Sequence, residues 1–338
     1  MRVGLVTHPS SLEHRGPASH PERPDRIAAA VAGVHQSGLV TVELTATSVS
    51  RNDLVRVHDE SFVDAIESFC AAGGGAIDLD TFAVEASWQA ALNAAGSGAT
   101  AVRALEGGDI DVAFVAMRPP GHHAERARAM GFCLFNNVAV AAAALADKGQ
   151  RIAIVDWDVH HGNGTQEIFA ADRDVLYVSI HQDPFYPGTG SVDEIGEGEG
   201  IGATINIPMT EGAGGTDYAE AMARVVVPVV EQFAPDWMLV SAGYDAHTAD
   251  PLAGIRLEDG DYSAMSSGLA PLVPGARTVF FLEGGYDLAA VRDSIAATLD
   301  GHAGLAKGPR YGTPSSDTAV SGTIGQIVET LAPYWDVG

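Results

Sequence analysis

The chain has 338 residues, 46% of them apolar, which is enough to build a large hydrophobic core. Its 44 acidic residues against 19 lysines and arginines give a formal net charge of -25, so it lacks the basic surface that nucleic acids or anionic membranes require. With two cysteines and no apolar run of membrane-spanning length, we predict neither a disulfide framework nor a transmembrane segment, but a cytoplasmic protein.

Short apolar segments alternate along the chain with longer, alanine-rich segments of helical periodicity. In chain order, we predict a strand at Val3–Thr7, helices at Arg23–Ser37, Ser61–Ala71 and Ser87–Leu105, a strand at Val112–Ala116, a helix at Asn137–Lys148, strands at Ile152–Asp156, Val175–Ile180 and Ala203–Ile207, a helix at Thr216–Phe233, a strand at Trp237–Ser241, a helix at Leu257–Ala270, a strand at Thr278–Leu282 and a helix at Leu288–Leu299.

The order of these elements predicts an α/β fold. The strands are almost continuously apolar, which is typical of a parallel sheet covered by helices on both faces. No repeat, low-complexity tract or change of composition divides the chain. We therefore predict a single domain over residues 1–338.

Polar, glycine-rich segments follow four of the predicted strands. Ligand sites in parallel sheets form beyond the carboxyl ends of the strands. We therefore expect these four segments to meet at one rim. They are MRPPGHHAE (117–125), DWDVHHGNG (156–164), SAGYDAHTADP (241–251) and EGGYD (283–287).

The second of these segments contains candidate metal ligands. Asp156, Asp158 and His160 share one side of the chain if it stays extended, because side chains alternate along a strand. Two of them, together with Asp245 from another loop, would give three protein ligands and an open position, which is the pattern of a catalytic zinc site. The alternative is that the aspartates form turns and the histidine lies at the surface.

The first and last segments contain candidate catalytic side chains. His122 and His123 follow the rigid sequence RPPG and have the residue type of a general base and acid. Tyr286 follows two glycines, which allow close backbone approach, and its hydroxyl is suited to stabilising an oxyanion. A histidine pair alone is more often a surface or core feature, and a tyrosine alone is an ordinary residue of a glycine-rich turn. Their joint occurrence at strand ends is what favours a site.

Together these segments resemble the histone deacetylase family, which has the arginase/deacetylase fold. The resemblance covers most of the chain in matching order, and HHAE, DWDVHHGNGTQ and LEGGY are similar to the class II and bacterial branches. The matching segments are SHPERPDRI (19–27), RPPGHHAERARAMGFCLFNNVAVAA (118–142), DWDVHHGNGTQEIF (156–169), VSIHQDPFYPGTG (178–190), SAGYDAHTADPL (241–252) and LEGGYDL (282–288).

The resemblance implies a role for each candidate. His123 would be the general base and then the acid, His122 its electrostatic partner bonded to Asp156, and Tyr286 the oxyanion donor. A histidine replaces this tyrosine in weakly active or binding-only relatives, so its presence favours an enzyme. Zinc would polarise the acetyl carbonyl and activate a water molecule. The implied zinc ligands are Asp158, His160 and Asp245.

One position behind the base separates the branches of the family. Asn163 stands where class I members have an aspartate, and class II members share the asparagine. A neutral amide stabilises an imidazolium less than a carboxylate would, which favours a neutral His123 that is competent as a base.

The resemblance also implies a narrow apolar channel for the acylated side chain. Phe132 and Tyr186 would form its walls, with Gly131 allowing close backbone approach. Leu252 stands where the polyamine-selective branch has a glutamate, which argues against selection for a second ammonium group. Asp80 follows a glycine-rich segment (71–78) that we expect to be a flexible rim loop, and it is a candidate to bind a substrate backbone.

A structural potassium ion is implied as well. Its ligands would be backbone oxygens of the zinc-site segment, from Asp156, Asp158 and His160, and the side chain of Ser179.

The favoured function is zinc-dependent hydrolysis of acetyl or other acyl groups on lysine or a similar amine. The substrate would be an acetylated lysine peptide or protein, or an acetylated small amine, and the oligomeric state is left open. Three alternatives stay open: a deacetylase for acetylpolyamines or other small molecules, an arginase-like ureohydrolase with two manganese ions, and a non-catalytic acetyl-lysine binder. Intact candidates for the zinc ligands, the base and Tyr286 argue against the last.

Overall fold

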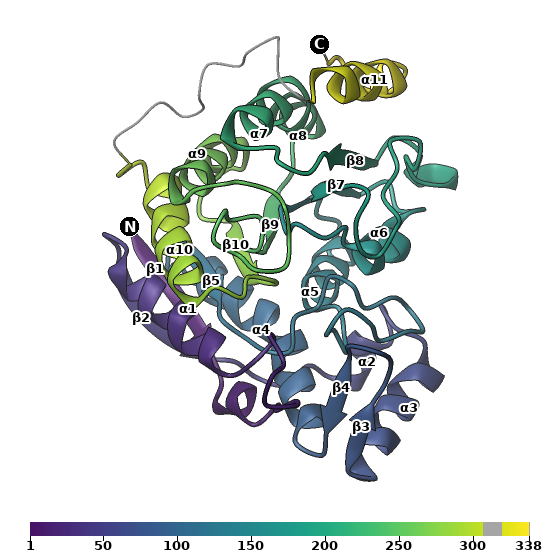
Figure 1. Cartoon of the computed structure of the whole chain (residues 1–338), viewed down its shortest axis with the longest axis vertical. Coiled ribbons are helices and arrows are strands. Elements are labelled where there is room, and N and C mark those ends of the chain that lie inside the picture. The colour runs from purple at the N-terminus through teal and green to yellow at the C-terminus, as the bar shows by residue number, and fades with distance from the viewer. Residues whose placement is uncertain (307–319, 338) are drawn as a thin grey trace.

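The apolar strands of the chain form one central sheet in the computed structural model, which describes residues 1–306 and 320–337 (Figure 1). All eight strands of this sheet run parallel, in the order β2-β1-β5-β10-β9-β6-β7-β8. They are β1 (Arg2–Thr7), β2 (Val40–Thr45), β5 (Val112–Val115), β6 (Ile152–Asp156), β7 (Val175–Gln182), β8 (Thr204–Met209), β9 (Trp237–Ala242) and β10 (Thr278–Leu282).

Alternating side chains of each strand enter two different cores. Phe114 and Val155 belong to one apolar cluster, whereas their neighbours Val115 and Ile154 belong to the other, as the period of two in a strand requires. Burial on both faces is why the strands are apolar throughout.

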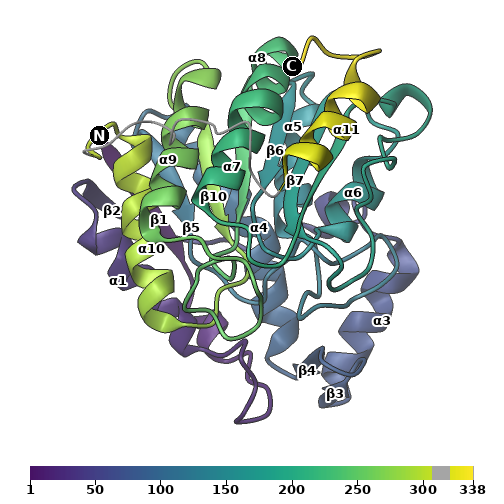
Figure 2. The same cartoon turned by 45° about the horizontal axis from the view of Figure 1, so that its top comes forward.

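Helices cover both faces, as predicted (Figure 2). The first core is closed by α1 (Asp25–Gln36), α7 (Gly215–Ala221), α8 (Val227–Phe233), α9 (Asp259–Leu269), α10 (Leu288–His302) and α11 (Ser321–Leu331). The second core is closed by α2 (Arg51–Leu54), α3 (Glu60–Ala71), α4 (Ser87–Glu106), α5 (Asn137–Ala146) and α6 (Asn163–Phe169). The predicted α/β architecture is therefore confirmed. None of the described helices is long and apolar enough to span a bilayer.

Several predicted elements differ from those observed. The helix predicted at Thr216–Phe233 is interrupted by a π-helical segment, Met222–Val226. Pro228 lies two residues after this segment, and its missing N–H removes the helical hydrogen bond to Arg224 within it, which accounts for a local change of hydrogen-bond register. The edge strand β2 escaped prediction because its residues are only partly buried or exposed, so its sequence is less apolar.

The glycine-rich rim segment is also more regular than predicted. Residues 71–78 contain strand β3 (Gly74–Ala76), which pairs antiparallel with β4 (Phe82–Val84). The segment is therefore one arm of a hairpin rather than a flexible loop. The single-domain prediction for residues 1–338 stays a prediction, since 307–319 and 338 lie outside the described residues.

The strand order brings the predicted functional segments together. The four strands that they follow are adjacent in the sheet, in the order β5-β10-β9-β6. Because all four run parallel, their carboxyl ends open at the same edge, where the rim was predicted.

Candidate active site

A cavity of about 220 Å³ lies at this edge of the sheet. It collects the predicted histidine pair, the histidine of the metal segment, the tyrosine of the last loop and all four predicted channel residues. Its lining is Asp80, Pro120, His122, His123, Gly131, Phe132, His160, Tyr186, Leu252, Gly284 and Tyr286. These residues thus converge on one cavity from loops that lie far apart in the sequence.

The candidate metal ligands converge at this cavity. Nδ1 of His160 lies 3.1 Å from Oδ1 of Asp158 and 3.1 Å from Oδ2 of Asp245. One side-chain donor atom from each residue lies within 4.8 Å of the other two. Both carboxylates are fully buried, whereas the histidine is only partly covered.

The local backbone corrects one step of the sequence argument. Strand β6 ends at Asp156, and the three side chains do not share a face of an extended chain. Instead Asp156 accepts the N–H of Asp158, and Asp158 accepts the N–H of His160, which are successive aspartate turns. These turns direct Asp156 toward the histidine pair, while Asp158 and His160 face Asp245.

The chemistry of these three residues suits a divalent cation. Burial disfavours the charged imidazole, but hydrogen bonds to Asp158 and Asp245 outweigh it and raise the pKa of His160 to about 10. The pair of carboxylates thus attracts positive charge. Gly284 lies so close that a Cβ there would overlap both carboxylates, so the glycine leaves these oxygens their space. Two carboxylates and one imidazole also match the ligand types of catalytic zinc.

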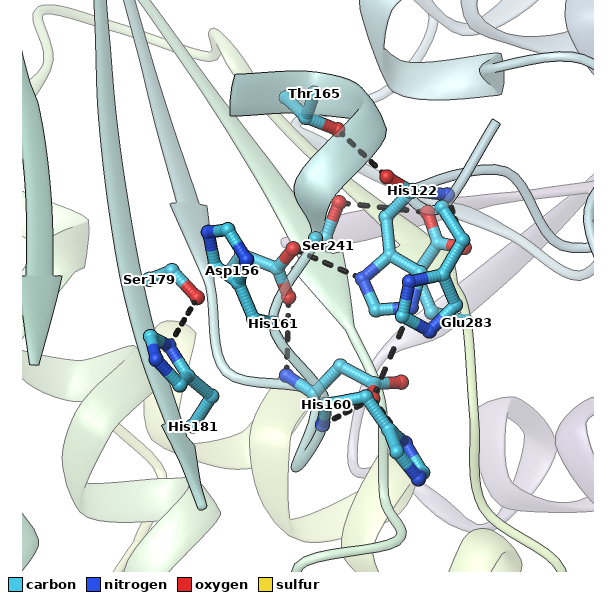
Figure 3. A network of polar contacts seen from close by, with 12 residues as sticks. His122, Asp156, His160, His161, Thr165, Ser179, His181, Ser241 and Glu283 are labelled. Carbon is cyan, nitrogen blue, oxygen red and sulfur yellow. Dashed lines mark hydrogen bonds and ion pairs between the residues drawn. The ribbon is translucent and has the colours of Figure 1, made fainter. Parts of the chain in front are cut away.

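His122 is tied to Asp156 behind the cavity (Figure 3). Its Nδ1 lies 3.0 Å from Oδ2 of Asp156, which also accepts the hydroxyl of Tyr177 at 3.1 Å. Burial opposes the charged ring, but Asp158 and Asp156 prevail and raise the pKa of His122 to about 10. His122 is therefore suited to a permanent positive charge rather than to proton transfer.

His123 has the opposite character. Burial and the neighbouring His122 and His160 hold the pKa of His123 well below its usual value, so the ring is neutral. The side-chain N–H₂ of Asn163 donates to Glu125 at 2.7 Å, which leaves Oδ1 of Asn163 to accept from Nδ1 of His123 at 2.8 Å. The proton therefore resides on Nδ1, and Nε2 keeps the lone pair that a base requires.

Tyr286 is held between a cation and an aromatic ring. The guanidinium of Arg26 lies 5.1 Å from the centre of its ring, and Phe132 contacts it edge-on at 6.0 Å. Burial and the charge of Asp245 raise the pKa of Tyr286 well above its ordinary value. The hydroxyl therefore stays protonated and can donate a hydrogen bond.

The predicted channel residues form the walls and the mouth. Phe132 has a φ of 68°, unusual for a non-glycine residue, and its N–H donates to the hydroxyl of Thr81 in the β3–β4 hairpin at 3.1 Å. Gly131 lies directly against the ring of His123, where a Cβ would overlap it. Tyr186 and Leu252 are each 37% exposed and mark the entrance.

A buried charge network behind the site was missed by the sequence analysis. Both arginines, Arg26 and Arg118, pair with the single carboxylate of Glu22, and all three are buried. Arg26 also donates to the backbone oxygens of Glu283 and Gly285, just before Tyr286. The signal was present in SHPERPDRI and RPPG, but nothing in the sequence shows which charges meet.

Glu283 is a further residue of the site for which no role was predicted. Its carboxylate accepts the N–H groups of Gly121 at 2.7 Å and of His122 at 3.2 Å. It thereby anchors the histidine loop to the end of β10, beside the His122 ring (Figure 3).

The chain matches known proteins along most of its length. The family model of the histone deacetylase domain matches residues 20–302. Histone deacetylase 15 of Arabidopsis thaliana is 38% identical over 327 residues, which cover 94% of this chain and 59% of that protein. The histone deacetylase-like amidohydrolase of Pseudomonas aeruginosa is 40% identical over 282 residues, 81% of this chain and 74% of that protein.

A solved structure agrees with the sequence match. The crystal structure of the HDA15 HD domain superimposes with a TM-score of 0.91 at 37% identity. The match covers 99% of this chain and 95% of that one. The similarity therefore includes the strands and loops that carry the cavity.

Proposed function

The chain belongs to the histone deacetylase family, as the match over residues 20–302 shows, and on this premise we propose that it is a zinc-dependent hydrolase of acetylated amines. Its deacetylase and amidohydrolase relatives place it among the hydrolases of this family. The observation that carries the proposal is one cavity lined by His123, His160 and Tyr286, with the carboxylates of Asp158 and Asp245 at its base.

The ligand set supports one metal ion. Within residues 1–306 and 320–337, Asp158, His160 and Asp245 are the one group of histidine and acidic side chains with donor atoms close enough to hold a metal. A single three-ligand group favours a mononuclear zinc site over the paired manganese ions of an arginase-like enzyme. Bound zinc would supply Lewis acidity that polarises the acetyl carbonyl and acidifies a water molecule.

The proton transfers fall to His123. As a neutral ring with its proton on Nδ1, it accepts the proton of the attacking water at Nε2 and later returns it to the leaving amine. His122 stays positively charged through its pairing with Asp156. Its charge lowers the basicity of His123, which helps His123 to return the proton to the leaving amine. Tyr286 donates its hydroxyl to the oxyanion of the tetrahedral intermediate.

The shape of the cavity supports a long aliphatic amine as substrate. Phe132 and Tyr186 would enclose the methylene stem of an acetylated lysine while its amide reaches the zinc ligands. Asp80 also lines the cavity, and its carboxylate would accept a substrate backbone N–H, which favours a peptide or protein over a free small amine.

A potassium ion and a cytoplasmic location belong to the same proposal. The potassium proposal is supported by Ser179 on β7, which is the register partner of Asp156 at the end of β6. The Ser179 hydroxyl contacts Nδ1 of His181 at 2.9 Å, so a potassium ion would share it with that ring.

The proposal is tested by metal removal. Protein stripped by a chelator should release no acetate from an acetyl-lysine peptide, and one equivalent of zinc should restore the rate. Iron(II) and cobalt(II) are added in parallel, because this ligand set accepts them too. Acetate release that survives complete removal of metal would overturn the proposal.

Leu252 at the cavity mouth should determine selectivity between substrates. Leu252→Glu places a carboxylate beside the entering chain, where it attracts the second ammonium group of an acetylated polyamine. We expect the ratio of kcat/KM for acetylpolyamine over acetyl-lysine peptide to rise by about two- to fivefold, the range typical of one partly exposed ion pair. Leu252→Gln is the uncharged control; an equal shift in that variant would exclude the charge as the cause.

Asn163 should determine the acid limb of the pH profile. Asn163→Asp places a carboxylate at Nδ1 of His123, which favours the imidazolium and raises the pKa of the base. Because the base works only when neutral, the acid limb of kcat/KM should move to higher pH by about one unit or more. A limb that stays in place, or moves to lower pH, would show that His123 is not the base.

A further inference from the structure

The loop after β9 is joined to the tyrosine loop by one side chain. Asp250 is only 7% exposed, and its Oδ2 accepts the N–H of Tyr286 at 2.6 Å and the N–H of Asp287 at 3.3 Å. Its Oδ1 accepts the N–H of Leu252 at 3.0 Å. One carboxylate therefore fixes the backbone of two residues that line the cavity, one deep inside it and one at its mouth.

Two buried side chains, Arg26 and Asp250, hold the peptide that leads into Tyr286 from its two sides. Backbone bonds join the loops after β9 and β10 only as far as Gly284, whose carbonyl accepts the N–H of Tyr244 at 3.1 Å. Gly285 follows with a φ of 113°, which glycine adopts readily, and its carbonyl accepts the Nε–H of Arg26 at 2.6 Å. The next N–H is that of Tyr286, and it is bound by Asp250.

The arrangement also distinguishes Asp250 from a residue that only caps a helix. The first turn of α10 is capped by Asp287, which accepts the N–H groups of Ala289 and Ala290. The carboxylate of Asp250 instead binds the N–H of Tyr286, one residue before this cap, and the Tyr286 side chain lines the cavity.

We propose that Asp250 is a positioning residue for the reaction, which holds the hydroxyl of Tyr286 at the reacting carbonyl and ties it to Leu252 at the mouth. The role of Tyr286 as oxyanion donor rests on the proposed function. The position of the Tyr286 backbone does not, so the two are tested separately.

Asp250→Asn is the informative substitution. Both oxygens of Asp250 accept hydrogen bonds, and an amide of nearly the same shape keeps only one acceptor. The variant must therefore release either the tyrosine loop or Leu252, without leaving a hole. Asp217→Asn is the matched control, because Asp217 likewise accepts a backbone N–H, from Gly214 at 2.8 Å, at the start of α7.

The kinetic test is a double-mutant cycle with Tyr286→Phe. Asp250→Asn should lower kcat by roughly ten- to a hundredfold while zinc content stays at the wild-type value, the range expected when a catalytic group is displaced. In the Tyr286→Phe background the same change should cost less than about threefold, because the group that it positions is gone. If the two losses of kcat multiply in the double variant, the substitutions act independently and the proposal is overturned.

The structural test does not depend on turnover. Crystal structures of Asp250→Asn and Asp217→Asn, grown under the same conditions, should show Tyr286 displaced or in several conformations only in the first. If Tyr286 and Leu252 both stay in place in Asp250→Asn, the positioning role is contradicted even if the wild type deacetylates. Absence of acetate release by the wild type would refute the proposed function, and the Tyr286 position would still decide the role of Asp250.

Discussion

His160→Ala is expected to abolish tight zinc binding and to lower acetate release by about a thousandfold or more. The ring of His160 is the one imidazole in the ligand group and contacts both carboxylates, so its loss removes a third of the protein ligands and leaves Asp158 and Asp245 facing each other. Loss of the metal removes several kcal/mol of transition-state stabilisation, which corresponds to this factor. Zinc per chain is measured by elemental analysis after dialysis.

The neighbouring histidine provides a matched control. His161 contacts Thr189 and Gln166 instead of the carboxylates, at 2.8 Å and 2.9 Å. His161→Ala should therefore keep one zinc per chain. Asp158→Ala should behave like His160→Ala. Wild-type zinc content in either of these two variants would remove that residue from the ligand group.

Tyr286→Phe should leave the zinc content unchanged and reduce kcat by roughly two to three orders of magnitude, the usual scale for loss of one oxyanion donor. The substitution removes only the hydroxyl, so the contacts of the ring with Arg26 and Phe132 are kept. KM should change little, because the hydrogen bond is strongest in the tetrahedral state. The measurement is steady-state acetate release with zinc determined on the same sample.

A rate within about threefold of the wild type would exclude Tyr286 as the oxyanion donor. A large loss that is accompanied by loss of zinc would point to a structural role instead. Tyr177→Phe offers a comparison, since that hydroxyl bonds to Asp156 behind the cavity and does not line it.

The fold was predictable because the buried strands can be identified from their apolar sequences alone. Burial on both faces makes β5, β6, β7, β9 and β10 continuously apolar, and each was predicted within two residues of its observed ends. The general rule for parallel sheets then placed the functional loops at one edge. The half-exposed β2 and the π-helical segment at Met222–Val226 carry no comparable signal.

The candidate site was predictable wherever chemistry depends on residue type. His122, His123, His160 and Tyr286 all line the cavity, and Asp156 and Asn163 contact the two histidines of the pair as expected. Their catalytic roles remain predictions.

Residues that act through their contacts could not be found in the sequence. Asp250 and Glu283 work by accepting backbone N–H groups from other loops, and a backbone donor leaves no mark in a sequence. The pairing of Glu22 with two arginines likewise depends on how helix α1 meets the loop after β5. The direction of Asp156 was decided by local turns rather than by strand alternation.

The central claim is that this cavity hydrolyses acetylated amines with one zinc ion, and the most direct measurement is acetate release from an acetyl-lysine peptide by protein reconstituted with one equivalent of zinc. The account predicts multiple turnovers by the wild type and a rate lower by roughly two to three orders of magnitude in Tyr286→Phe with the same zinc content. No acetate from wild-type protein that holds one zinc per chain would contradict it.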